Sequence, residues 1–260
     1  MKESLRNNLR IIKDLTLTDF KLKYNRSVLG FFWSLLKPLL MLATLYIVFH
    51  RLIKLDVPHY ELFLLIGIIL WGFFTEATSY SMSALNRNTN LIRKTNLNKK
   101  LIIISTNISA FISLMLNLII FFFFVIIFEA GFSWHLVLFA VLLAELFLFA
   151  LGMSFILSAL YPRFRDLSHI WDVLMQVGFW VTPIIYPISF IPKQFHNWYI
   201  LNPLARIIED SRNALIFHKL PPVDFSYLKH VSITFIICVG ALIIGLIIFS
   251  KKSKKFAEQI

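Results

Sequence analysis

Residues 101–128, LIIISTNISAFISLMLNLIIFFFFVIIF, contain no charged side chain and no histidine. Continuous apolar runs of about 20 residues are the signal for a transmembrane helix, because a rise of about 1.5 Å per residue must cross roughly 30 Å of hydrocarbon. A membrane β-barrel would show short alternating strands in place of such a run. The stretch therefore indicates a helix that spans a bilayer.

Five further apolar stretches lie on either side of it, at 31–50, 62–85, 136–161, 170–191 and 231–250. The composition agrees: 58% of the 260 residues are hydrophobic and 15% are charged, whereas soluble domains have about 45–50% apolar and about 25% charged residues. We expect an all-α integral membrane protein with six transmembrane helices. A soluble enzyme is all but excluded.

The net charge of +12, from 26 Lys and Arg against 14 Asp and Glu, would suggest nucleic-acid binding in a soluble protein. With the N-terminus inside the cell, however, 18 of the 26 cations fall in segments on the inner side, seven fall outside and Lys37 lies within a span. Cytoplasmic segments of membrane proteins carry such an excess. We therefore expect both termini in the cytoplasm and no nucleic-acid partner.

Three regions are predicted along the chain. Residues 1–30 form a cytoplasmic amphipathic interface helix and loop, because apolar residues in 3–24 share one face and Lys and Arg cover the rest. Residues 31–250 form the transmembrane domain, and 251–260 form a basic cytoplasmic tail. Within the domain, the outer segment 193–224 predicts short re-entrant or interfacial helices, with a structured extracellular loop as the alternative.

Motifs for catalysis are absent from the sequence. It contains no GxxxxGK[ST] loop, so the chain cannot hydrolyse ATP by itself. Its seven histidines do not fall at metal-ligand spacing, and there is no GxSxG. We expect neither a metal site nor an enzymatic activity in this chain.

Three acids lie within or beside the spans, namely Glu76, Glu145 and Asp172. An ionisable group in a membrane is costly and suggests a functional role. Glu76 heads a polar face of the second span, because Ser79, Tyr80, Ser83 and Arg87 follow at helical spacing. Such a face should point at other helices or at water. The alternative is that these groups form interhelical hydrogen bonds that fix packing.

The segment 23–33, KYNRSVLGFFW, followed by Lys37-Pro38-Leu39, closely resembles the approach to the first span in ABC-2 type permeases that export polysaccharides. That family includes the permeases for O-antigen, teichoic acid and capsule. RFRDL at 163–167, Tyr186-Pro187-Ile188 and Asn202-Pro203-Leu204 are further matches. Each motif is short, but their order extends the resemblance over essentially the whole chain.

The resemblance implies the fold of an ABC-2, type V exporter-like permease in a bacterial plasma membrane. It implies a homodimer that pairs with two copies of a cytosolic ABC ATPase, which binds the ATP and Mg; no cofactor is expected in this chain. The substrate would be a polysaccharide joined through pyrophosphate to a polyprenyl lipid. The coupling helix would fall on 86–100, with Arg87, Arg93, Lys94, Lys99 and Lys100, and the outer re-entrant helices on 193–224. From the residues alone, the cations of 86–100 could equally reflect only the excess of Lys and Arg that cytoplasmic segments of membrane proteins carry.

Two sets of residues receive candidate roles on this basis. The lipid pyrophosphate would enter at Arg26 together with Tyr24, Leu29, Gly30 and Trp33, because cations form strong charge-assisted hydrogen bonds with phosphate; ordinary positive-inside anchoring is the alternative. Aromatic platforms for sugar rings would line the conduit beside Glu76, although lipid contact would also explain any one of them. These aromatic candidates are Trp71, Phe74, Tyr80, Trp171, Phe179, Trp180 and Tyr186.

Other classes of transporter are less well supported. An ABC-2 permease for drugs or small lipids would share the architecture but should lack the full YxxSxLGxxW signature. A secondary transporter or channel is disfavoured by the few intramembrane acids and by the absence of repeated halves.

Overall fold

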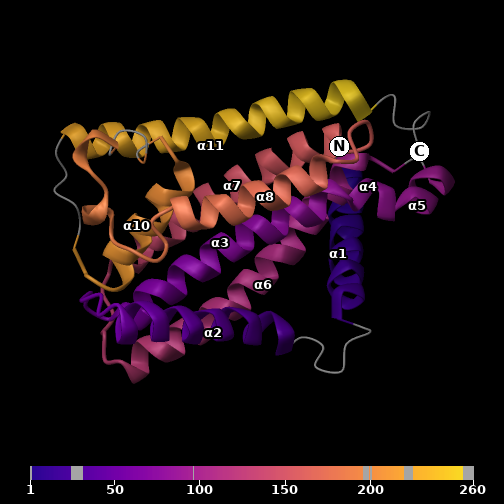
Figure 1. Ribbon diagram of the computed structural model, residues 1–260. Helices are drawn as coiled ribbons and strands as arrows, with labels where there is room; N and C mark the ends of the chain where they lie inside the picture. The colour runs from indigo at the N-terminus through magenta and orange to yellow at the C-terminus, as the bar shows by residue number, and fades with distance from the viewer. Residues whose placement is uncertain are drawn as a thin grey trace.

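The computed structural model describes residues 2–24, 32–95, 97–195, 199, 201–219 and 225–253; for 2–5, 24, 193 and 225–230 it describes the backbone alone. Within these ranges the chain forms helices and connecting turns and no β-strand. The long helices run roughly side by side, with α11 along one edge and α2 along the other (Figure 1). The predicted all-α class is confirmed.

Five helices are long and apolar enough to cross a membrane, at 32–52, 60–82, 99–127, 136–160 and 231–252. They match five of the six predicted spans to within a few residues. In order, they are α2 (Phe32–Tyr46) continued by the π-helix η1 (Ile47–Leu52), α3 (Tyr60–Met82), α6 (Lys99–Ile127), α7 (Leu136–Leu160) and α11 (Phe225–Lys252).

The sixth predicted span, 170–191, is helical only in its first part. Its helix, α8 (Leu167–Val181), has 15 residues and ends ten residues before the predicted boundary. Thr182 takes an extended conformation, with ψ of 139°, because it precedes Pro183, and a proline disfavours the helical conformation of the residue before it. A stretch without α-helix follows, in which the only regular elements of the described residues up to 195 are the short 3-10 helices η2 (Ile188–Phe190) and η3 (Lys193–Phe195).

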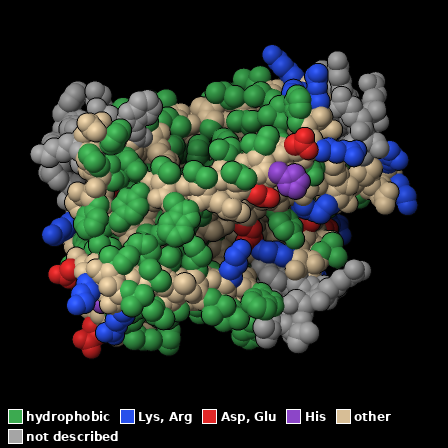
Figure 2. Space-filling view, in the orientation of Figure 1, with side chains coloured by type: hydrophobic (Ala, Val, Ile, Leu, Met, Phe, Trp, Pro, Cys, Tyr) green, Lys and Arg blue, Asp and Glu red, His purple; other side chains and the backbone are tan. Residues whose placement is uncertain are grey.

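The first helix, α1 (Lys2–Tyr24), lies across one end of the bundle, close to perpendicular to the long helices (Figure 1). The short helices α4 (Ala84–Arg87) and α5 (Thr89–Lys94) lie at this same end. Hydrophobic side chains cover most of the middle of the visible face, and charged side chains gather mostly toward its ends (Figure 2). The position of α1 at the end of the bundle, across the long helices, suits a helix that lies along a membrane surface.

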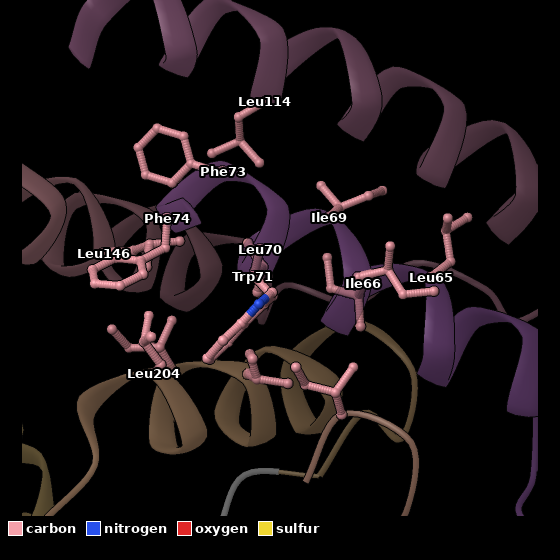
Figure 3. Close-up of a cluster of buried hydrophobic side chains, with 14 of the residues drawn as sticks. Leu65, Ile66, Ile69, Leu70, Trp71, Phe73, Phe74, Leu114, Leu146 and Leu204 are labelled. Carbon is pink, nitrogen blue, oxygen red and sulfur yellow. The ribbon is translucent and has the colours of Figure 1, made fainter. Parts of the chain in front are cut away.

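The core is built around α3, of which most residues are buried. Its side chains lie among Leu114 of α6, Leu146 of α7 and Leu204 of the helix α10 (Pro203–Leu215), as Figure 3 shows. A helix that is apolar on nearly all sides is expected at the centre of a bundle. The sequence of α3 therefore explains its central position.

Helix α10 begins at a well-formed N-terminal cap. Asn202 accepts hydrogen bonds from the backbone nitrogens of Leu204 (3.1 Å) and Ala205 (3.4 Å), and Pro203 takes the first helical position. Asn is among the preferred N-cap residues, and Pro is favoured at that first position. Helix α10 packs against α7, α3 and α11, so the predicted outer segment contains one well-buried helix; residues 220–224 of that segment lie outside the described ranges.

Arg212 fixes α10 in the bundle. Its side chain is 0% exposed, and its guanidinium donates to the carbonyl oxygens of Pro183 (2.6 Å), Ile184 (2.7 Å) and Phe63 (3.2 Å). It also lies 3.4 Å from the centre of the Phe63 ring. Arg212 therefore joins α10 and α3 to the non-helical chain after α8, and it supplies donors to the carbonyls of Pro183 and Ile184, which lie outside any helix.

The α7–α11 crossing depends on two glycines that allow close backbone contact. A Cβ atom on Gly152 would lie 2.6 Å from the carbonyl carbon of Ala241, and one on Gly245 would collide with the Gly152 carbonyl oxygen. Small residues let membrane helices approach closely and gain dispersion energy. The two glycines therefore set the spacing of α7 and α11.

We expect Arg212→Met to destabilise the protein by about 3 kcal/mol or more, because it leaves the buried carbonyls of Pro183 and Ile184 without a donor. The measurement is the thermal unfolding midpoint of the full chain in detergent. Arg163→Met, at an exposed arginine of the α7–α8 turn, is the matched control. Equal midpoints for the two variants would contradict the role of Arg212.

A second comparison tests the glycine crossing. Gly152→Ala should cost about 1–3 kcal/mol, as overpacking of a filled core does. Gly240→Ala in α11 has open space around the added methyl, and it should leave the unfolding midpoint unchanged or raise it, because alanine favours helix. The same fall in both variants would show that the close approach does not matter.

Candidate functional site

The polar face predicted for the second span exists on α3. Among residues 71–80 of this otherwise buried helix, the positions with partial or full exposure are Gly72, Thr75, Glu76, Ser79 and Tyr80. They recur every three to four residues and therefore lie on one side of the helix. The polar face lies toward the end of the bundle that carries α1.

Part of this face binds the last turns of α1. The Lys23 ammonium forms an ion pair with the Glu76 carboxylate and donates to the Ser113 hydroxyl at 3.3 Å. The Thr106 hydroxyl donates to Asp19 at 3.2 Å. The expectation that the face points at a helix or at water is thus met on both counts, since α1 covers it in part and the rest is accessible.

Tyr80 contacts two cations. The Arg87 guanidinium is 4.4 Å from the centre of the Tyr80 ring, and the Lys23 ammonium is 5.9 Å from it. Arg87 also donates to the backbone oxygen of Tyr80 at 2.9 Å and to the Ser83 hydroxyl. We refer to Asp19, Lys23, Glu76, Tyr80 and Arg87 as the charge cluster.

The charge cluster is partly buried and partly open to water. Burial raises the pKa of Asp19 above its usual range, and the nearby Arg87 and the Thr106 hydrogen bond oppose that rise. The side chains of Lys23 and Glu76 keep 17% and 29% of their surface exposed. The ion pair is therefore partly accessible to water and is not sealed in the core.

The predicted conduit residues divide into two groups. Trp71, Phe74, Trp171 and Phe179 are buried and pack against one another between α3 and α8, with ring centres 6.2–6.3 Å apart for Trp71–Phe179 and Phe74–Trp171. The Trp171 indole nitrogen also donates to the Thr78 hydroxyl at 3.0 Å. In this chain these four rings fill the core, so only a rearranged or assembled state could offer them to a substrate.

The remaining conduit candidates are accessible. Tyr80 is 38% exposed and Trp180 is 57% exposed. Tyr186 is partly exposed and donates to the Val181 backbone oxygen at 2.9 Å, as does Tyr199. These two tyrosines help to line a cavity of about 690 Å³ at the α10 end of the bundle, together with Phe49, Phe190, Phe195 and Asn202.

Most of the residues predicted to meet the lipid pyrophosphate lie outside the residues that the structure describes. Arg26, Leu29 and Gly30 lie outside the described residues, and Tyr24 ends α1 with only its backbone described. Trp33 is exposed at the start of α2. Their roles stay predictions.

The predicted coupling segment 86–100 forms α4, α5 and the first turn of α6. Arg93 and Lys94 are exposed in the last turn of α5. Arg87 instead belongs to the charge cluster, and Lys99 donates to the Ser253 backbone oxygen at 2.6 Å. Lys100 is the second residue of α6, and its backbone nitrogen donates to the side chain of the N-cap residue Asn98 at 3.1 Å. A basic small helix is present as predicted, and its binding role stays a prediction.

Two buried polar groups were not singled out from the sequence. Arg212 falls one turn after Ile208 on the apolar side of α10. A charged residue on an apolar helix face was the signal in the sequence for a buried polar group. Asn107 donates to Ser81 at 2.9 Å and accepts from Ser154 at 3.2 Å, which joins α3, α6 and α7. Both make contacts to distant parts of the chain that no local pattern reveals.

The fold is that of a multi-pass helical membrane protein with a surface helix at one end and a buried half-helix at the other. The chain belongs to the ABC-2 type transporter family, whose model matches residues 12–216. It is 31% identical to an O-antigen export system permease protein RfbA of Klebsiella pneumoniae over 99% of both chains. The identity is 26% to the protein of the same name from Myxococcus xanthus, over 96% of this chain and 95% of that one. It is 23% to the polysialic acid transport protein KpsM of Escherichia coli, over 79% and 81%.

The division of the conduit aromatics gives a testable contrast. Trp171→Ala should destabilise the protein by about 3 kcal/mol, because it removes a buried ring and its hydrogen bond. Trp180→Ala should leave stability nearly unchanged, since its ring is mostly exposed. Thermal unfolding in detergent measures both. An equal loss in Trp180→Ala would mean that this ring packs as Trp171 does.

Proposed function

We propose that this chain is the membrane subunit of an ATP-driven exporter that carries a polyprenyl-pyrophosphate-linked polysaccharide, of the O-antigen or teichoic-acid type, across a bacterial plasma membrane. The observation that carries the proposal is the similarity over nearly the full length to O-antigen export permeases. The chain acts by binding and guiding its substrate and performs no covalent chemistry.

The assembly we propose is a homodimer with two cytosolic ABC ATPase subunits, which hold the ATP and Mg. The exposed cations of α5 and the solvent side of α1 lie at the same end of the bundle, which supports this end as the ATPase-facing, cytoplasmic one. Both termini are then cytoplasmic.

Substrate roles follow the same division. The lipid pyrophosphate enters at Arg26 together with Tyr24, Leu29, Gly30 and Trp33. The conduit wall includes Glu76 and the accessible aromatics Tyr80, Trp180 and Tyr186, and the dimer partner supplies the opposite wall. The buried rings Trp71, Phe74, Trp171 and Phe179 support that wall from behind.

Reconstitution tests the proposal. The chain is purified with a candidate ABC ATPase partner and placed in proteoliposomes that contain a lipid-linked O-antigen-type glycan. Glycan should cross the membrane only when ATP and the ATPase are both present. Transport that is driven by an ion gradient without the ATPase would contradict the proposal.

Coupling through α5 can be tested in the same proteoliposomes. Lys94→Glu should lower ATP-driven export several-fold, because it reverses an exposed charge at the surface that meets the ATPase. Lys54→Glu changes an exposed lysine that follows η1, in the connection to α3, and should export normally. If the two variants behave alike, α5 is not the coupling surface.

A further inference from the structure

The charge cluster balances its own charges. Lys23 pairs with Glu76, and Arg87 interacts electrostatically with Asp19. Both of these cations also lie against the ring of Tyr80. Glu76 lies six residues before the end of α3, or about 9 Å along the helix axis. The cluster thus lies at the level where a head group of the adjacent leaflet would reach the protein.

The carboxylates are replaceable counter-ions. Partly exposed ion pairs contribute little net stability, because water already solvates both charges. A phosphate or diphosphate group carries more charge than a carboxylate and offers more acceptor oxygens. Arginine binds such groups in bidentate fashion and lysine binds them as a point charge. An incoming phosphate would therefore compete well with Glu76 for Lys23.

We propose that Lys23 and Arg87 form a binding site for a lipid-borne phosphate or diphosphate group, and that Glu76 occupies Lys23 as an internal substitute until this ligand arrives. Both cations contact the Tyr80 ring, with the Arg87 guanidinium 4.4 Å and the Lys23 ammonium 5.9 Å from its centre. When the ligand binds, the Glu76 carboxylate turns to the water that already reaches it. The diphosphate source rests on the proposed function; a membrane phospholipid offers the same chemistry.

Binding of farnesyl diphosphate to the full chain in phosphatidylcholine nanodiscs tests this site. Lys23→Gln and Arg87→Gln should each weaken binding by roughly fivefold or more, because each removes a cation that meets the phosphate. Glu76→Gln should tighten binding by about three- to tenfold, because it removes the competing anion and keeps the size of the side chain. The opposite signs are the signature of an internal substitute.

A purely structural ion pair gives a different result. If Lys23 and Glu76 only held α1 in place, breaking the pair from either side would change binding in the same direction, and that outcome would overturn the proposal. The unfolding midpoint of each variant is recorded to separate folding from binding. Lys21→Gln and Asp14→Asn, at exposed positions of α1, are the matched controls for the loss of one charge and should bind within about twofold of the original chain.

Two further probes identify the source of the phosphate. Farnesol tests the prenyl chain alone, and binding of farnesol as tight as that of the diphosphate would overturn the site. Phosphatidic acid with the same sign pattern and tighter binding than farnesyl diphosphate would assign the site to a membrane phospholipid. Because no ATPase is needed, a chain that shows the opposite signs but exports no glycan would overturn the proposed function and leave the site standing.

Discussion

Arg212 satisfies the constraint on which this structure depends most: polar groups that lie away from water must find partners within the protein. The chain after α8 is non-helical, so its carbonyl oxygens have no helical donors. Arg212 supplies those donors from α10 while its guanidinium packs on Phe63 of α3. Arg212 therefore joins three parts of the chain into one unit: the short helix α8, the buried helix α10 and the stretch without α-helix that follows α8.

Helix α3 connects this unit to the opposite end of the bundle. Near Arg212 it is buried on all sides, whereas near α1 it shows a polar and partly accessible face. Helix α1 contacts that face through Lys23 and reaches α6 through Asp19. Helix α1, which lies at the end of the bundle that we propose faces the ATPase, therefore also contributes to the proposed ligand site. Movement of α1 and occupancy of Lys23 are then physically linked.

Local features of the fold could be predicted from the sequence. Apolar length predicted six spans, five of which the structure contains as full-length helices, and the spacing from Glu76 to Arg87 identified the polar face. The end of α8 was missed, although Thr182-Pro183 contained the signal.

Long-range partners could not be predicted. Nothing near Glu76 in the sequence indicates that Lys23, 53 residues earlier, is its partner, and the carbonyls bound by Arg212 lie on two other segments. Such pairs depend on how helices cross, which the hydrophobic pattern of each helix leaves open. The aromatic candidates show the same limit, because spacing alone did not separate buried Trp171 from exposed Trp180.

A cryo-electron microscopy structure of the chain with its ATPase and a bound prenyl-diphosphate glycan tests the central claim most directly. Our account predicts diphosphate density between Lys23 and Arg87, beside the Tyr80 ring, with the Glu76 carboxylate turned away from Lys23. A bound diphosphate elsewhere, with the Lys23–Glu76 pair intact, would contradict it.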